Sequence, residues 1–345
     1  MKAVVWYGPH VIRLEERPLA EPGSGQVLIR PRYAGICGSD KKLYEYGVLG
    51  THRPSQPFIM GHEAAGTVAA VGPGVEGLST GDTVAVNPLL GCGQCFYCQR
   101  GEENLCERLT FRSITADGVF SEFFVLPAEQ ALRIPAGFDL RLAATIEPLS
   151  VGVQAMRRLP VQPSDSVLLI GAGTIGLGIL GMLRCAGVPR VMAADLLDHA
   201  CQQAREMGAA MVVNASREDL PQKAAAFFGP RGPDVVIEAA GAPEAQAEAL
   251  EFVRPGGSVL LVGITGEALT PVNVNRITRS NLQVLGTVRA TGESFRAAAE
   301  LVISGRVRTA GWISQVFPFE QALQAFECAS DPAYQLTKCL LEFPS

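Results

Sequence analysis

The chain has 345 residues, of which 48% are hydrophobic, and its formal net charge is −5. This length exceeds one ordinary hydrophobic core, so we expect about two domains. The acidic balance argues against a nucleic-acid or anionic-membrane partner. The first residues lack the apolar stretch of a signal peptide, and an odd number of cysteines, 9, disfavours a disulfide framework. The sequence therefore predicts a soluble protein of a reducing compartment, the cytoplasm.

Short runs of β-branched residues, separated by glycine and proline turns, fill the first 155 or so residues. The runs at 27–30, 66–71 and 82–86 are typical of strands. No long window has the helical period, so we expect this part of the chain to be mainly β. An irregular lobe at about 88–110 interrupts it.

The lobe contains four cysteines at the spacing of a metal site: Cys92, Cys95, Cys98 and Cys106. Two consecutive C-x2-C steps and a fourth cysteine can surround one tetrahedral ion. Zinc suits four thiolates because it is borderline soft and has no geometric preference of its own. Four sulfurs leave no open position on the ion, so we expect this zinc to be structural.

A sparser set of metal-binding side chains lies outside the lobe. Cys37 is followed by Gly-Ser-Asp, and His62 and Glu63 follow Gly61. A thiolate, an imidazole and a carboxylate can converge on a zinc ion that keeps one position open. Such a zinc would bind an alcohol oxygen and lower its pKa. Taken alone, His62 is more often an ordinary polar residue than a ligand, and sequence spacing does not decide between the two.

Strands and helices alternate from about residue 166 onwards. The strands are expected at 167–170, 190–194, 211–214, 234–238, 258–262 and 283–286, and the helices at 174–186, 198–207, 217–228 and 293–304. This alternation predicts a parallel doubly wound sheet with right-handed crossovers. The uncharged run at 167–183 is short and rich in glycine, so we interpret it as strand, turn and helix, not as a membrane span. A proline-punctuated tail ends the chain.

A glycine-rich turn joins the first of these strands to the first helix. It reads Gly171-Ala-Gly173-Thr174-Ile175-Gly176, the pattern that lets a backbone approach a pyrophosphate at a helix N-terminus. Asp195 ends the second strand, where its carboxylate would bind the ribose hydroxyls of adenosine. The same carboxylate would repel a 2′-phosphate, which favours NAD over NADP.

Together and in this order, the motifs resemble the zinc-dependent medium-chain alcohol dehydrogenases over nearly the whole chain. The segments Ile146-Glu-Pro-Leu-Ser-Val151 and Gly286-Thr-Val-Arg289 are similar to those of sorbitol and other polyol dehydrogenases. Galactitol-phosphate-type and aldonate-type dehydrogenases share much of the same pattern. The resemblance implies a β-rich GroES-like catalytic domain at 1–155, a Rossmann NAD-binding domain at 156–290, and a segment at 291–345 that returns to the first domain. It also implies an active site in the cleft between the domains and a homodimer or homotetramer.

The resemblance further implies roles for individual residues. Cys37, His62 and Glu147 would hold a catalytic zinc, and Glu63 would be a direct or exchanging ligand. Ser39 would hydrogen-bond the alcohol oxygen, and Arg289 would reach substrate hydroxyls or a carboxylate. The turn at Val262 and Gly263 would lie against the nicotinamide half of NAD. The expected reaction passes hydride from a secondary alcohol of a polyol or sugar derivative to NAD and gives a ketone.

Some positions depart from the pattern, and two other functions stay open. Lys42 stands where many family members have a histidine of the proton path, which leaves Ser39, the cofactor ribose, His52 or water for that role. Ala290 and Leu43 replace aromatic residues of the sorbitol enzymes, which argues against sorbitol itself.

A threonine- or simple-alcohol-type dehydrogenase is an alternative on the same scaffold. A zinc-ribbon binding module joined to a nucleotide-sensing domain is an alternative from another class.

Overall fold

The computed structural model describes residues 1–49, 53–54, 57–266 and 269–344. These residues form two compact units. The first unit contains Met1–Ser150, Ala290–Gly305 and Ile313–Ser345, and the second contains Val151–Arg289 and Arg306–Trp312. The chain therefore leaves the first unit twice, once for most of the second unit and once for the short segment Arg306–Trp312, and returns each time.

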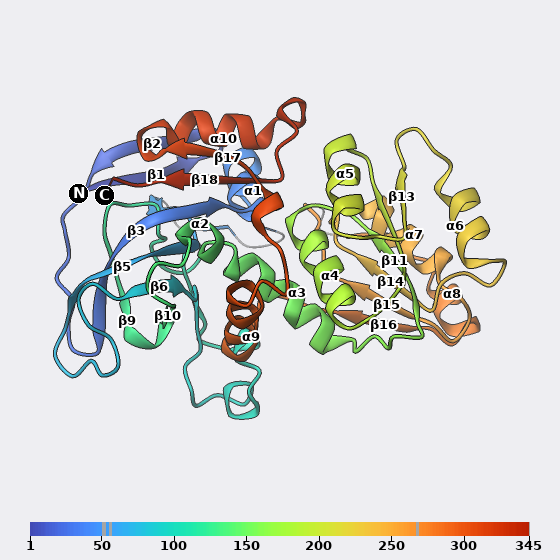
Figure 1. Ribbon diagram of the computed structural model, residues 1–345, viewed down its shortest axis with the longest axis horizontal. Coiled ribbons are helices and arrows are strands. Elements are labelled where there is room, and N and C mark those ends of the chain that lie inside the picture. The colour runs from blue at the N-terminus through green and yellow to red at the C-terminus, as the bar shows by residue number, and fades with distance from the viewer. Residues whose placement is uncertain (50–52, 55–56, 267–268, 345) are drawn as a thin grey trace. The chain divides into compact units, whose positions relative to one another are not determined.

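The first unit is mainly β (Figure 1). Its strands are β1 (Lys2–Gly8), β2 (Val11–Glu16), β3 (Gln26–Ile36), β4 (Phe58–Ile59), β5 (Glu63–Val71), β6 (Thr83–Val86), β7 (Leu89–Leu90), β8 (Thr110–Phe111), β9 (Phe124–Pro127), β10 (Ala131–Arg133), β17 (Ile313–Pro318) and β18 (Lys338–Glu342). Its helices are α1 (Gly38–Tyr46), α2 (Leu140–Ala143), α9 (Gly292–Ile303) and α10 (Ala322–Ser330). Helix α3 (Ile146–Arg158) begins in this unit and ends in the second.

A seven-stranded sheet organises the first unit, in the order β10-β6-β5-β3-β18-β17 with β9 also paired to β3. Strand β3 is central because it pairs antiparallel with β5, β9 and β18. The main core of the unit includes Val27 and Ile29 of β3, Phe120, and Phe326 of α10. Strand β18 therefore brings the end of the chain against the strand that leads into Cys37.

The first unit is mainly β, as expected, but several of its elements were not predicted. The residues before 155 contain helices α1 and α3, where the sequence indicated no helix. The first two turns of α3 are almost completely buried, and its last two residues, Arg157 and Arg158, are exposed. The proline-punctuated tail also contains regular structure, since β17 and β18 pair in parallel and extend the sheet.

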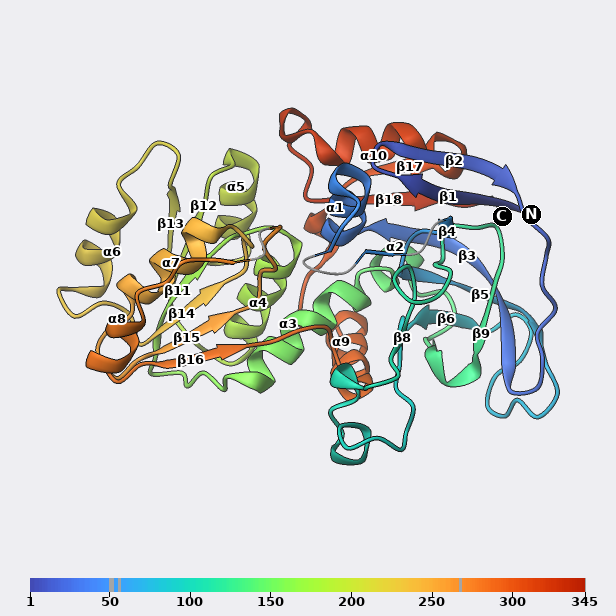
Figure 2. The same ribbon diagram turned by 180° about the vertical axis from the view of Figure 1, so that it is seen from behind.

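The second unit has one parallel sheet covered by helices (Figures 1 and 2). Its strands are β11 (Ser166–Ile170), β12 (Arg190–Asp195), β13 (Met211–Asn214), β14 (Val235–Glu238), β15 (Ser258–Leu261) and β16 (Gln283–Gly286). Its helices are α4 (Thr174–Cys185), α5 (Asp198–Glu206), α6 (Leu220–Phe228), α7 (Pro243–Phe252) and α8 (Val274–Arg279).

The strand order of this sheet is β13-β12-β11-β14-β15-β16, and each neighbouring pair is parallel. Every residue of β11 is buried, as expected for a central strand covered on both faces. Helices α6 and α7 share one core with the strands, while α4 and α5 lie on the opposite face. The predicted doubly wound parallel sheet is confirmed. The crevice of such a sheet opens where the strand order reverses, beside β11 and β14.

Among the residues that the structure describes, no helix combines the length and the apolar character that a bilayer crossing needs.

Candidate metal and nucleotide sites

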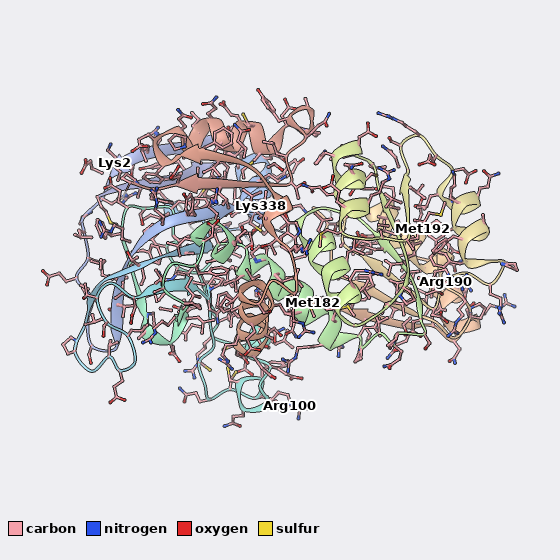
Figure 3. All side chains as sticks on the ribbon, in the orientation of Figure 1. Lys2, Arg100, Met182, Arg190, Met192 and Lys338 are labelled. Carbon is pink, nitrogen blue, oxygen red and sulfur yellow. The ribbon has the colours of Figure 1, made fainter. Side chains whose placement is uncertain are left out.

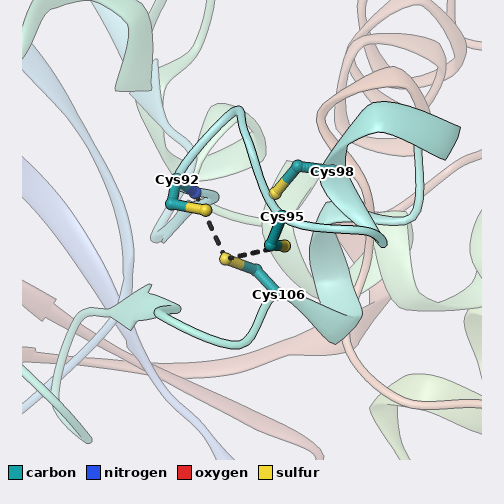
Figure 4. Close-up of side chains that lie close together, drawn as sticks. All are labelled: Cys92, Cys95, Cys98 and Cys106. Carbon is teal, nitrogen blue, oxygen red and sulfur yellow. Dashed lines mark hydrogen bonds between the residues drawn. The ribbon is translucent and has the colours of Figure 1, made fainter.

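The four cysteines of the lobe gather their sulfur atoms around one point (Figure 4). Their Sγ atoms all lie within 4.8 Å of one another. The backbone N–H groups of Cys92 and Arg108 donate to the Cys106 Sγ at 3.2 and 3.3 Å. A hydrogen bond from the backbone of Gln94 is the main cause that lowers the pKa of Cys92 to about 6. The donor set fits a closed, tetrahedral zinc site.

The lobe is an excursion between two short strands. Strand β7 pairs antiparallel with β8, so that Leu89 lies opposite Phe111. Within the lobe, the Glu103 carboxylate accepts a hydrogen bond at 2.6 Å from the backbone of Gly292, the first residue of α9. The lobe is thus fixed to the unit at its base and through Glu103.

Cys37 stands at the end of β3 and caps helix α1. Its backbone N–H donates to the Asp40 carboxylate at 2.9 Å, which is the capping arrangement of a third-position acid. Asp40 is fully buried, and burial is the main cause that raises its pKa, while His62 and the Cys37 backbone lower it. Ser39 is the second residue of α1 and is partly exposed. The cap therefore fixes the backbone between Cys37 and Asp40, the stretch that contains Ser39.

His62 and Glu63 stand at the start of β5, beside Cys37. Ligand atoms of Cys37, His62 and Glu63 lie within 4.8 Å of one another. His62 is 3% exposed, and its Nδ1 lies 3.7 Å from an Asp40 oxygen with no closer hydrogen-bond partner in the described chain. Burial lowers the pKa of His62, but Asp40 and Cys37 outweigh it and hold that pKa well above its usual value. An imidazole that turns one nitrogen to a carboxylate is oriented to offer the other to a metal.

Glu63 is held by a buried lysine. Lys338 Nζ lies 2.8 Å from both Glu63 carboxylate oxygens and 3.1 Å from the carbonyl oxygen of Ile36 (Lys338 is labelled in Figure 3). A Cβ atom at Gly35 would overlap the Glu63 carboxylate, so only glycine permits this close approach. Burial lowers the pKa of Lys338, but the charges of Glu63 and Cys37 raise it above its usual value overall.

Glu147 adds a further carboxylate near this group. It lies in the first turn of α3 and is 8% exposed. Burial raises the pKa of Glu147 to about 7, with His62 acting in the opposite direction and Glu63 in the same direction. Several acidic groups that share one buried region favour a bound cation, so the donor chemistry fits zinc. The choice of Glu63 or Glu147 as the direct ligand stays a prediction.

The other residues expected in catalysis are placed as follows. Lys42 lies in α1 and is partly buried. Arg289 belongs to the second unit, has a φ of 55° and has its pKa lowered by burial. His52, a possible part of the proton path, lies outside the described residues.

The glycine-rich turn of the second unit joins β11 to α4. Gly171 has a φ of 94°, and a Cβ atom there would lie 2.6 Å from the backbone nitrogen of Ala240. Gly173 is the N-cap of α4 and, having no side chain, leaves the helix N-terminus open to a ligand. A Cβ atom at Gly173 would meet no atom within 4 Å. This turn fits a pyrophosphate at the helix N-terminus.

Three more predicted cofactor residues lie at the carboxyl ends of strands β12 and β15 of the same sheet. The Asp195 carboxylate at the end of β12 accepts hydrogen bonds from the backbone of Ala172 at 2.7 Å and of Leu197 at 2.9 Å. Val262 and Gly263 follow β15, and their N–H groups donate to the carbonyl oxygen of Glu238 at 2.8 and 3.1 Å. The predicted groups thus share the carboxyl edge of one sheet, where nucleotides bind in folds of this type.

Asp40 and Lys338 are functional candidates that sequence reasoning missed. Asp40 is only three residues after Cys37, and an acid at that offset is a capping signal that could have drawn attention to it. Lys338 lies 275 residues from Glu63, and no local pattern connects the two. Only the pairing of β18 with β3 brings that lysine to the site.

Comparison with known families gives matches over both units. A family model described as the alcohol dehydrogenase GroES-like domain matches residues 23–136, and one described as zinc-binding dehydrogenase matches residues 174–304. Together these ranges cover more than half of the chain. The first range lies within the unit that contains both cysteine sites, and the second includes strands β12 to β16 of the parallel sheet and helix α9 of the first unit.

Individual proteins match nearly end to end. Sorbitol dehydrogenase of Bacillus subtilis is 33% identical over 330 residues, which covers 95% of this chain and 93% of that protein. L-threonine 3-dehydrogenase of Pyrococcus horikoshii is 32% identical over 329 residues, with 95% and 93% covered. A dehydrogenase of Escherichia coli CFT073, solved with NADH, superposes with a TM-score of 0.91 at 31% identity and covers 99% of both chains.

Proposed function

The chain belongs to the zinc-dependent medium-chain alcohol dehydrogenases, and from this membership we propose that it oxidises a secondary alcohol of a polyol or sugar derivative to a ketone with NAD. The alternative of a zinc-ribbon binding module is set aside, because the family is one of oxidoreductases. Zinc and NAD agree with the family and with the donor sets of the two units.

The group of Cys37, His62 and Glu63, in which His62 and Glu63 are buried, is the observation that carries this proposal. A thiolate, an imidazole and a carboxylate within 4.8 Å of one another form a donor set that, unlike four thiolates, leaves zinc an open position. A zinc ion held there would act as a Lewis acid toward the alcohol oxygen. Asp40 orients the imidazole of His62, and Lys338 holds the Glu63 carboxylate in place.

The remaining predicted residues act on substrate and cofactor. Ser39 hydrogen-bonds the alcohol and takes part in moving its proton, while Arg289 contacts other hydroxyls or a carboxylate of the substrate. Asp195 binds the adenosine ribose, and the turn at Gly171–Gly176 binds the pyrophosphate. Val262 and Gly263 contact the nicotinamide half. NAD supplies the hydride acceptor, and these residues orient it.

The substrate class rests on a smaller set of residues. The sorbitol and threonine enzymes match this chain at nearly the same identity, 33% and 32%, so identity does not choose between their substrates. The polyol assignment is supported by Glu147-Pro-Leu-Ser150 and by Arg289, which resemble the polyol enzymes. The threonine enzyme keeps an amino alcohol as the second candidate substrate.

A substrate panel tests the proposal. Purified protein is mixed with NAD and with polyols, aldonates, sugar phosphates, threonine or simple alcohols, and NADH absorbance is followed. We expect the highest kcat/KM on a polyol or sugar derivative, and loss of activity when NADP replaces NAD. The highest kcat/KM on threonine would establish the amino-alcohol alternative. No activity on any secondary alcohol would refute the proposed function.

Assembly and location are also proposed. We infer a homodimer or homotetramer, as family members resemble this chain over its whole length. A cytoplasmic location is supported by the reduced thiolates that both metal groups require. Sedimentation of the purified protein, with a single species of about one chain mass as the contrary result, tests the assembly.

A further inference from the structure

Ser113 has an unusual backbone conformation in a buried place. Its φ is 68°, in the left-handed region that residues with a side chain rarely adopt, and it is 1% exposed. The other described non-glycine residues with positive φ, which are His10, Asn281, Arg289 and Gln335, are exposed or partly buried. Backbone strain of this kind persists only where the surroundings over-determine it, and it is concentrated at functional sites.

The strained backbone directs the Ser113 hydroxyl at Asp40. The Ser113 Oγ donates a hydrogen bond to Asp40 Oδ1 at 3.2 Å. The other Asp40 oxygen accepts from the Cys37 backbone at 2.9 Å, and His62 Nδ1 lies 3.7 Å from Oδ1. Asp40 is completely buried, so its position is set by these neighbours and not by water. Ser113 thus contacts Asp40, and Asp40 in turn lies beside His62.

The segment that carries Ser113 is the one that leaves the four-cysteine lobe. It begins with β8, whose Phe111 pairs with Leu89 of β7 at the base of the lobe (Figure 2 labels β8). The Phe111 ring lies 5.4 Å from the His62 ring, centre to centre. A turn closed by the Ser113 N–H and the Ala116 carbonyl at 2.8 Å then fixes Ser113 itself. One short segment therefore contacts His62 directly and also through Asp40.

We propose that Ser113 is a positioning residue for the metal site: its hydroxyl fixes the Asp40 carboxylate, and Asp40 in turn fixes the His62 imidazole. This inference rests on the proposed zinc site at Cys37, His62 and Glu63. An imidazole held in one orientation loses less conformational freedom when it binds a metal. Mutating the hydrogen-bond partner of a ligating histidine typically lowers metal affinity by about 10–100-fold. Because Ser113 acts through Asp40, we expect its hydroxyl to contribute about 10-fold, the lower end of that range.

Two substitutions at this position separate the hydroxyl from the strain. Ser113→Gly removes the hydroxyl and also relieves the backbone, since glycine adopts positive φ without a steric penalty. Ser113→Ala removes the hydroxyl and keeps the strain. Both variants lose the hydrogen bond to Asp40, so the glycine variant, whose backbone is relieved, should unfold at a higher temperature than the alanine variant. Both variants should bind the zinc ion of the Cys37, His62 and Glu63 site, called the second zinc, about 10-fold more weakly than the wild type.

Thr115→Ala is the matched control in the same turn. The Thr115 hydroxyl accepts from the Phe111 N–H at 2.8 Å and donates to the Leu109 carbonyl at 3.2 Å. It stabilises the segment but makes no contact with Asp40 among the described residues. Its loss should lower the unfolding temperature and leave the affinity of the second zinc within about twofold of the wild type, since uninvolved surface groups change little.

The measurement is zinc transfer from the holoenzyme to a chromogenic chelator, with the absorption spectrum of a cobalt-substituted protein as a second readout. Weaker binding in both Ser113 variants, but not in Thr115→Ala, supports the proposal, as does a changed cobalt spectrum. Wild-type affinity in Ser113→Gly, or equal weakening in Thr115→Ala, overturns it. A wild-type protein that holds only one zinc would instead refute the proposed function.

Discussion

Asp195 is the residue to which we assign the choice of cofactor. Its carboxylate is fixed by two backbone N–H groups, from Ala172 in the glycine-rich turn and from Leu197 beyond β12. These bonds place a negative charge beside the turn that fits the pyrophosphate. A ribose with free hydroxyls can donate to this carboxylate, while a 2′-phosphate is repelled by it. In our proposal, the selection of NAD therefore depends on a carboxylate that the fold holds in place.

Replacing Asp195 with asparagine should weaken NAD binding. A hydrogen bond to a charged group contributes about 1.5–3 kcal/mol, so the NAD dissociation constant should rise by about 10–100-fold. NADP binding should improve, since the repulsion is removed. Asp219→Asn is a matched control because Asp219 caps α6 through the backbone of Gln222, and asparagine caps equally well. Titration of cofactor fluorescence measures both; an unchanged NAD constant in the Asp195 variant would contradict the assigned role.

Three strands meet at the metal site, and one lysine connects them. Lys338 begins β18, the Ile36 carbonyl that it contacts ends β3, and Glu63 begins β5. Lys338 and Glu63 are 2% and 0% exposed. A buried ion pair contributes little net stability when intact, but breaking it leaves an uncompensated charge. The C-terminal strand is thus part of the site.

Lys338→Met should therefore lower the free energy of unfolding by about 3–5 kcal/mol, because Glu63 remains buried without its partner. Lys223→Met is the matched control. Lys223 pairs with Glu218 at 3.0 Å, but both side chains are substantially exposed, so its loss should cost at most about 1 kcal/mol. Urea unfolding compares the two variants. Losses of equal size would show that the buried pair has no special role.

The elements that sequence reasoning found and missed differ in a physical way. The strands and helices around Gly171 were predictable because a fully buried strand followed by a glycine turn and a helix has a local signature. Helix α3 was missed although its apolar and polar residues follow the helical period. Strands β17 and β18 were missed because their pairing with the rest of the sheet spans the whole chain. Local sequence carries no record of such a register.

The same distinction applies to the candidate site at the scale of the molecule. The lobe cysteines lie within 15 residues of sequence, so their spacing alone predicts one ion. Cys37, His62 and Glu147 lie far apart in the sequence, and their assignment to one ion came from the resemblance to a family. The fold brings ligand atoms of Cys37, His62 and Glu63 within 4.8 Å of one another. Asp40, Ser113 and Lys338 were not predicted, since their contacts exist only in the folded unit. The supporting residues were therefore harder to predict than the ligands.

We assign different roles to the two metal groups. The lobe offers zinc four thiolates and no open position, whereas the group at Cys37 offers a mixed donor set suited to chemistry. We propose that catalysis belongs to the group at Cys37 and stability to the lobe. Variants of one cysteine from each group test that claim directly.

The decisive experiment compares Cys37→Ser and Cys95→Ser with the wild type, which we expect to hold about two zinc ions. Zinc content, unfolding temperature and the rate of alcohol oxidation are measured for each protein. Cys37→Ser should keep the lobe zinc and nearly the wild-type unfolding temperature, but lose activity on the order of 1000-fold, because metal catalysis contributes several kcal/mol. Cys95→Ser should lose the lobe zinc and unfold at a lower temperature, with activity reduced only as far as the fold is weakened. Full activity in Cys37→Ser, or a stable but inactive Cys95→Ser, would contradict the account.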